Sequence, residues 1–117
     1  MRDDVDYRMI SAEHRIISDE SYLLPEPVYA QCVWIVRDID RLRDVAKSEY
    51  DAPDVLIARK RIAAYNKAIR VVPREYREGI LRNISDRVKP DMTASVSTWH
   101  RWKIKFLYAL ARNLALY

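Results

Sequence analysis

Hydrophobic residues recur every three or four positions along most of the chain, the spacing of an α-helix with one buried face. The first such run follows the stretch "LPEPVY", where a proline is tolerated in a first helical turn and Glu26 suits the positive end of the helix dipole. The pattern predicts a helix from about residue 24 to residue 46. Its apolar positions are Val28, Cys32, Ile35, Ile39, Leu42 and Ala46.

A second run with the same spacing begins at Pro53, after the linker "SEYDAPD". Two such runs joined by a short linker predict an antiparallel helical hairpin over residues 24–72. Trp34 falls outside the first run, so we expect it to pack against the C-terminal part of the chain or, less commonly, to contact another subunit. The apolar positions of the second run are Val55, Ala58, Ile62, Tyr65, Ile69 and Val72.

Two further helices are predicted in the C-terminal part. Pro73 ends the second helix and opens a third, which ends between Arg87 and Pro90. Gly79 lies in the middle of this third helix, where it costs about 1 kcal/mol relative to alanine, so we expect it to mark a close helix crossing. A last helix runs to about Leu114, capped by Ser95, Ser97 or Thr98. Its predicted core side comprises Trp99, Trp102, Phe106, Leu110 and Leu114.

The content of turn-forming residues agrees with a helical fold, because a single glycine supplies few of the positive-φ turns that a sheet needs. We therefore expect an all-α fold, an N-terminal antiparallel helical hairpin packed on an abbreviated C-terminal helix-turn-helix. Residues 24–117 would form one domain, with residues 73–117 as the part resembling a helix-turn-helix. Residues 1–23 show no sustained period and are predicted to be a partly ordered arm.

Charge is divided unequally along the chain. Residues 1–54 carry 7 basic and 13 acidic side chains, a balance of −6, whereas residues 55–117 carry 14 and 4, a balance of +10. From Thr93 to the end there are four basic residues and no acid. A polyanion would meet little repulsion there, which favours double-stranded DNA as the partner.

The last helix also has the residue types that contact DNA on its polar side. Guanidinium groups make bidentate contacts to phosphates and base edges, and hydroxyls near a helix N-terminus suit phosphate oxygens. A proline-containing connection followed by a basic helix is typical of a helix-turn-helix that presents a recognition helix. The predicted DNA contacts are Ser95, Ser97, Thr98, His100, Arg101, Lys103, Lys105 and Arg112.

Other chemistry is not indicated by the sequence. The chain has no glycine-rich phosphate loop, and His14 and His100, with a single cysteine, do not suffice for a closed zinc site. We expect no catalytic residue, no cofactor and no metal. The single cysteine, Cys32, favours a reducing compartment. No apolar run is long enough to predict a membrane span, and the polar N-terminus does not resemble a signal peptide. A cytoplasmic location is therefore expected.

Three stretches, in this order, resemble a known family: "YLLPEPVYAQCVWIVRDIDRL", "VPREYREGILRNI" and "STWHRWKIKFLYALARNL". The chain is similar to the small phage-type transcriptional regulators of the RinA and ArpU kind, found in phages and prophages. The resemblance implies a sigma-like helix-turn-helix, late gene activation and recruitment of host RNA polymerase. It also implies that "SVSTWHRWK" begins the recognition helix, anchored by Trp99 and Trp102.

Two alternatives to a DNA-binding regulator stay open at this stage. The first is a DNA-packaging component such as a terminase small subunit, in which the hairpin over residues 24–72 joins subunits. The second is a non-catalytic interaction or inhibitor module that binds a protein through the acidic N-terminal half. The regulator hypothesis is compatible with a monomer or a homodimer, whereas a large ring would favour packaging.

Overall fold

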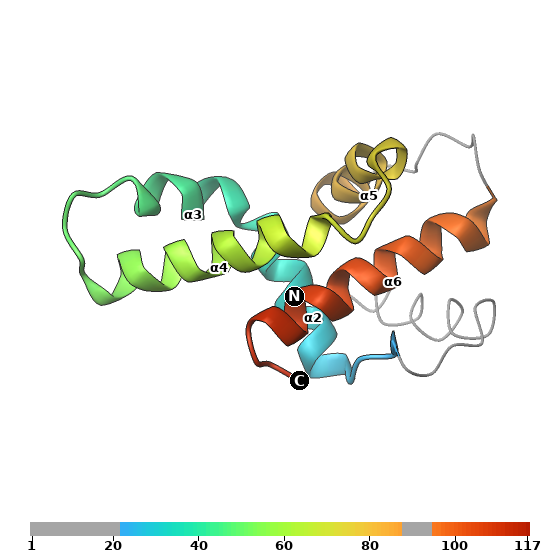
Figure 1. The fold of residues 1–117 in the computed structure, drawn as a ribbon, viewed down its shortest axis with the longest axis horizontal. Coiled ribbons are helices and arrows are strands. Elements are labelled where there is room, and N and C mark those ends of the chain that lie inside the picture. Colours follow the sequence, from blue (N-terminus) through green and yellow to red (C-terminus); the bar gives the residue numbers. More distant parts are fainter. Residues whose placement is uncertain (1–21, 88–94) are drawn as a thin grey trace.

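The computed structural model describes residues 22–87 and 95–117, and within these ranges the fold is entirely helical (Figure 1). The expected all-α class is confirmed. The predicted arm over residues 1–23 lies almost wholly outside the described residues, and so does most of the connection before the last helix. The helices are α2 (Glu26–Arg37), α3 (Ile39–Ala46), α4 (Pro53–Ile69), α5 (Arg74–Asp86) and α6 (Val96–Asn113).

Prolines mark the starts of three helices, as the sequence predicts. Pro25 and Pro73 immediately precede α2 and α5, and Pro53 is the first residue of α4. Proline is suited to these positions because its fixed φ matches the helix and the first N–H groups have no partner within the helix. At its other end α5 stops at Arg87, whose φ of 57° is left-handed and cannot continue the helix.

The predicted continuous helix over residues 24–46 is wrong, because the chain breaks at Asp38 between α2 and α3. Asp38 has φ −95° and ψ 4°, outside the regular helical values. Its carboxylate is held by Arg41 through two hydrogen bonds of 2.7 and 2.6 Å. Ile35 and Ile39 are both buried on either side of the break, so the apolar period continues through it.

The break divides the predicted hairpin into two parts with different neighbours. α3 runs antiparallel to α4 and packs along it, forming an arm that extends from the rest of the molecule (Figure 1). α2 instead packs on α5 and α6. The Nε atom of Arg37 donates a hydrogen bond to the carbonyl oxygen of Ile84 at 2.8 Å, which joins the end of α2 to the last turn of α5.

The core lies around α6, which contacts α2, α4 and α5. Tyr65 of α4 meets Phe106 of α6 edge to face, with ring centroids 5.9 Å apart. Cys32 of α2 is wholly buried, and this burial raises the pKa of its thiol to about 12. The largest fully buried side chains are Phe106, Ile80, Ile84, Leu107, Leu110, Val36, Val72 and Cys32.

Trp34 does not pack into the molecule, contrary to the commoner of the two expectations. Its side chain is 52% exposed on α2, and the guanidinium of Arg37 lies over the ring at 5.2 Å from its centroid. A tryptophan buries a large apolar area when it is covered, so an exposed one leaves an unusually large apolar surface in water.

Candidate nucleic-acid interface

The start of α6 is closed by a cluster of three hydroxyls. Ser95 is the cap, because its Oγ accepts a hydrogen bond from the backbone N–H of Thr98 at 3.2 Å. The same Oγ lies 2.8 Å from Oγ1 of Thr98 and 3.1 Å from Oγ of Ser97. Of the three capping residues considered from the sequence, Ser95 is therefore the one that caps, and the other two hydroxyls are tied to it.

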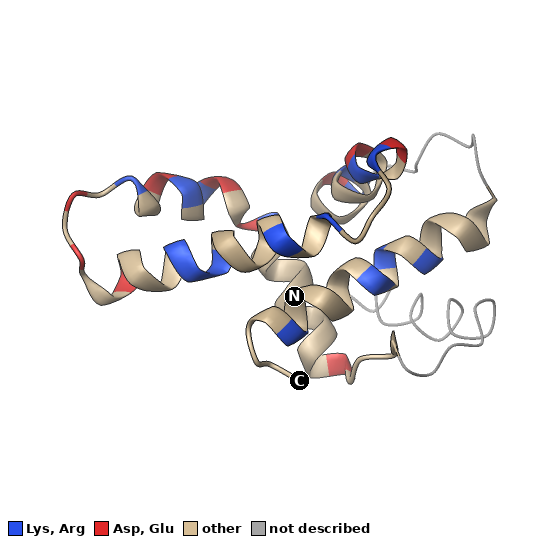
Figure 2. Ribbon diagram, viewed as in Figure 1, with Lys and Arg blue, Asp and Glu red and all other residues tan. Residues whose placement is uncertain are grey.

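The N-terminal half of α6 extends away from the α3–α4 arm toward the opposite side of the molecule (Figure 1). Ser95 is exposed and Val96 is 47% exposed. α6 contains no Asp or Glu, and in Figure 2 it shows only basic segments, whereas α3, α4 and α5 carry both signs. The start of α6 is therefore exposed, and the helix itself carries basic residues and no acid.

Three basic side chains form the outward face of α6, which we call the α6 basic face: Arg101, Lys105 and Arg112. Arg101 and Arg112 are exposed and Lys105 is half-buried. Arg101 and Lys105 lie one turn apart, about 6 Å along the helix axis, and Arg112 lies about two turns further on. None of the three forms an ion pair within the described part of the chain. Arg112 donates a hydrogen bond to the carbonyl oxygen of Tyr117 at 3.0 Å.

Aromatic rings hold the central lysine of this face. The Nζ atom of Lys105 lies 5.0 Å from the ring centroid of Trp102 and 5.2 Å from that of Tyr22, within the range of cation–π attraction. Tyr22 in turn meets Tyr108 edge to face at 5.3 Å. The contact of Tyr22 with Lys105 could not be predicted from the sequence pattern, because Tyr22 comes from the opposite end of the chain. The contact of Trp102 with Lys105 could be predicted, because residues three positions apart on a helix are neighbours.

Two predicted DNA contacts lie elsewhere on α6. Lys103 is only 4% exposed, so its side chain is not presented on the α6 basic face, and its assignment as a surface contact is corrected. The physical reason is its angular position, about 40° from the buried Trp99 around the helix. His100 is half-buried, and this burial, together with the charge of Lys103, lowers the pKa of its imidazole.

The buried side of α6 is also wider than predicted and rotated. Trp99, Phe106 and Leu110 are buried as expected, whereas Trp102 and Leu114 are only partly buried. α6 is covered by three helices rather than one, so its buried arc extends beyond a narrow stripe. The remaining buried positions on this helix are Lys103, Ile104, Leu107 and Ala111.

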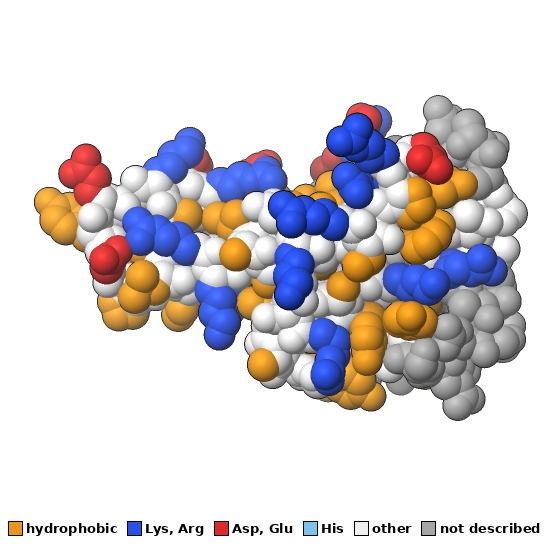
Figure 3. All heavy atoms as spheres, in the orientation of Figure 1, with side chains coloured by type: hydrophobic (Ala, Val, Ile, Leu, Met, Phe, Trp, Pro, Cys, Tyr) orange, Lys and Arg blue, Asp and Glu red, His pale blue; other side chains and the backbone are white. Residues whose placement is uncertain are grey.

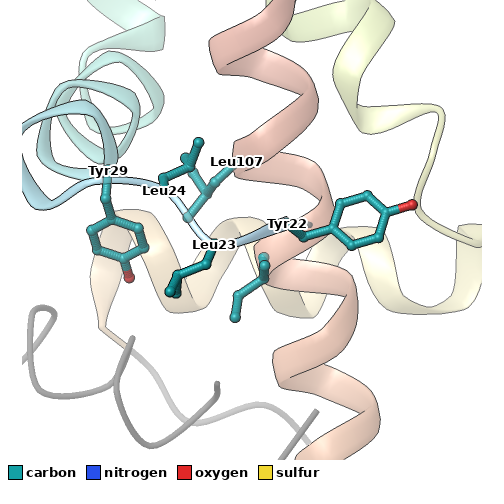
Figure 4. Close-up of a pocket in the computed structure, with 6 residues that line it drawn as sticks. Tyr22, Leu23, Leu24, Tyr29 and Leu107 are labelled. Carbon is teal, nitrogen blue, oxygen red and sulfur yellow. The ribbon is translucent and has the colours of Figure 1, made fainter. Parts of the chain in front are cut away.

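The cavity beside α6 is too small to be a ligand site. It has a volume of about 10 Å³ and lies between the segment before α2 and the middle of α6. Such a volume admits at most about one water molecule. Figure 4 shows Tyr22, one of the residues that line this cavity, pointing across α6 and away from Leu24 and Tyr29. Its ring centroid lies 5.2 Å from Nζ of Lys105.

The residues that the structure describes include no cluster of three or more His, Cys, Asp or Glu side chains arranged for a metal ion. None of the described helices has the length and apolar character needed to cross a bilayer. Comparison of the chain with protein-family models, with curated proteins and with solved structures found no match.

Proposed function

We propose that the protein binds double-stranded DNA through the α6 basic face and acts as a phage or prophage transcriptional regulator. The observation that carries the proposal is the exposed run of Arg101, Lys105 and Arg112 on a helix without acids, with none of the three engaged in an ion pair in the described ranges. Basic side chains without acidic partners are available to neutralise phosphates, which dominate the affinity of DNA-binding proteins.

The side chains of this face would contribute differently to binding. Lys105 is held between Trp102 and Tyr22, so its ammonium is positioned in advance for a phosphate and loses little freedom on binding. Arg101 is exposed near the helix start and has the planar fork that makes bidentate contacts to guanine or phosphate. The hydroxyls and N–H groups at Ser95 lie at the positive end of the helix dipole, which favours a phosphate there.

The regulatory part of the proposal is supported by the resemblance to the RinA and ArpU kind of regulator. In that arrangement α6 would enter the major groove and α5 would lie across it, as in a helix-turn-helix. Host RNA polymerase would then be the protein partner. The residues between α5 and α6 that would complete the motif, 88–94, lie outside the described part of the chain.

The test is fluorescence-anisotropy titration of a random-sequence DNA duplex across a series of salt concentrations. We expect non-specific binding in the micromolar to sub-millimolar range that weakens steeply with salt, by about 0.9 in log–log slope for each phosphate neutralised. Arg101→Ala and Lys105→Ala should each weaken binding, and Lys105→Ala should reduce the slope by about 1. Both positions lie on the surface side of α6, so the helical circular dichroism signal should be retained.

Lys47→Ala is the matched control for these variants. Lys47 is an exposed lysine at the end of α3, in a weak surface pair with Asp44 at 3.5 Å, and its removal changes the net charge by the same amount. If binding depends on the α6 basic face, Lys47→Ala should bind as the wild type does. Absence of binding at low salt, or equal losses in all three variants, would contradict the proposal.

A further inference from the structure

A groove lies between α2 and α4, where the α3–α4 arm joins the rest of the molecule. Two adjoining cavities of about 300 and 250 Å³ share Gln31, Ile35 and Arg61 as walls. The outline in Figure 3 is indented on the lower side between the arm and the body. We call the surface formed by Gln31, Trp34, Ile35, Ile57, Lys60 and Arg61 the α2–α4 groove.

The groove is apolar with a positive rim. Trp34 and Ile57 line it and are about half exposed, at 52% and 50%. One acid, Asp38, also lines the groove; it is bound by Arg41 at 2.6 Å, and the charge of Arg61 acts on the same carboxylate. Lys60 and Arg61 form no ion pair with an acid in the described ranges, so the rim carries an excess of positive charge. An occupant that complements this surface is apolar at its centre and acidic at its edges.

The end of the α3–α4 arm has this chemistry. Tyr50 is 78% exposed and stands between Glu49 and Asp51 in the loop that joins the two helices. Residues 48–54 contain three acids and no basic residue; Asp51 is paired with Arg59, whereas Glu49 and Asp54 form no ion pair in the described ranges. In Figure 3 hydrophobic and acidic side chains gather at this end of the arm.

The loop is also held in shape by its own hydrogen bonds. Arg59 of α4 donates to Oδ1 of Asp51 at 2.8 Å and to the carbonyl oxygen of Ser48 at 2.8 Å. The backbone N–H of Tyr50 donates to Oγ of Ser48 at 3.2 Å. A protruding side chain on a loop that is already ordered loses little conformational entropy on binding, so it is suited to fill a pocket.

We propose that a second copy of this chain docks the Tyr50 loop of its arm into the α2–α4 groove. Within one molecule the loop stands at the far end of the arm and α2 at its base, so the loop does not reach its own groove (Figure 1). The contact is therefore head to tail, and repetition of such a contact produces a ring or a filament. This self-association surface uses neither Arg101 nor Lys105, so it is independent of the proposed DNA binding.

The test is the mass of the protein in solution, measured by light scattering after gel filtration over a range of concentrations. The wild type should form species larger than a monomer as concentration rises. Tyr50→Ala removes the inserted side chain and Trp34→Ala removes a wall of the groove, and each should weaken association at least about tenfold. Both side chains are exposed, so circular dichroism should show unchanged helix content. Val71→Ala, at an exposed apolar residue outside both surfaces, is the matched control and should associate as the wild type does.

Mixing the two variants makes the test specific for a head-to-tail contact. A Trp34→Ala chain retains its loop and a Tyr50→Ala chain retains its groove, so an equimolar mixture should form a dimer of one copy of each and nothing larger. If Trp34→Ala does not fold, Lys60→Glu replaces it in the same mixture. A wild type that stays monomeric, variants that associate normally, or a mixture of folded variants that forms no dimer would each overturn the proposal.

Discussion

The indole ring of Trp99 in α6 lies directly on Gly79 in α5. A Cβ atom built at Gly79 would lie 2.6 Å from Cη2 and 2.7 Å from Cζ3 of that ring, distances that real Cβ atoms do not show. Trp99 cannot move aside easily, because it is 5% exposed and meets Tyr76 edge to face at 5.0 Å. The glycine therefore marks the close crossing of α5 and α6, as its position in the sequence predicts.

We expect Gly79→Ala to destabilise the protein. The substitution gains about 1 kcal/mol of helix propensity, but overpacking of a filled site typically costs about 1–3 kcal/mol, and the rigid indole favours the upper part of that range. The free energy of unfolding, measured by urea denaturation, should fall by up to about 2 kcal/mol. Ser85→Ala, at an exposed position of the same helix, is the control and should not be destabilising. A Gly79→Ala variant more stable than the wild type would contradict the crossing described here.

Helix starts and most core positions could be predicted because their signals are local. Pro53 and Pro73 restrict their own φ, and Ser95 caps α6 through its own side chain. These effects do not depend on residues that are distant in the sequence. The break at Asp38 could not be predicted in this way. Ile35 and Ile39 keep the helical spacing across it, and the redirection of α2 arises from packing against α5 and α6.

Part of the candidate site could also be predicted from one helix alone. Arg101 is exposed on the expected outer face of α6. The predicted surface position of Lys103 is wrong, and Trp102 is only partly buried against the core, because the width of the buried arc depends on how many helices cover α6. The contact of Tyr22 with Lys105 joins residues far apart in the sequence, so no periodic pattern contains it.

Substitutions at Ser95 should separate the capping role of this residue from DNA binding. Ser95→Ala removes the acceptor for the N–H of Thr98 and should lower the free energy of unfolding by about 0.5–2 kcal/mol. Ser95→Asp keeps a good cap and places a negative charge at the positive end of the helix dipole, so stability should be retained. The same charge would repel phosphates, so the aspartate variant should bind DNA more weakly than the wild type.

Chemical denaturation and the anisotropy titration together test this separation. Ser97→Ala is the control for the denaturation measurements, because Oγ of Ser97 contacts Ser95 at 3.1 Å without accepting the capping N–H. A Ser95→Asp variant that is stable and binds DNA as tightly as the wild type would place the phosphates away from the start of α6.

Protonation of His100 should make the folded state less stable in mild acid. Burial, and the charge of Lys103 in the same direction, lower the pKa of His100 below its ordinary value of 6.5. The unfolded chain therefore binds a proton at this residue more readily than the folded chain does, between the lowered pKa and 6.5. In that interval the free energy of unfolding rises with pH, so the contribution of His100 is fully present above 6.5 and is lost as the pH falls.

The measurement is urea denaturation of the wild type and of His100→Gln at pH 7.5, 6.5 and 5.5. Carboxylates and His14 titrate in both proteins, so the difference between the two stability curves isolates His100. The wild type should lose more stability than His100→Gln between pH 7.5 and 5.5, so the two curves should converge or cross as the pH falls. Parallel curves would show that the imidazole binds a proton as readily in the folded chain as in the unfolded one, which would contradict the effect of its partial burial.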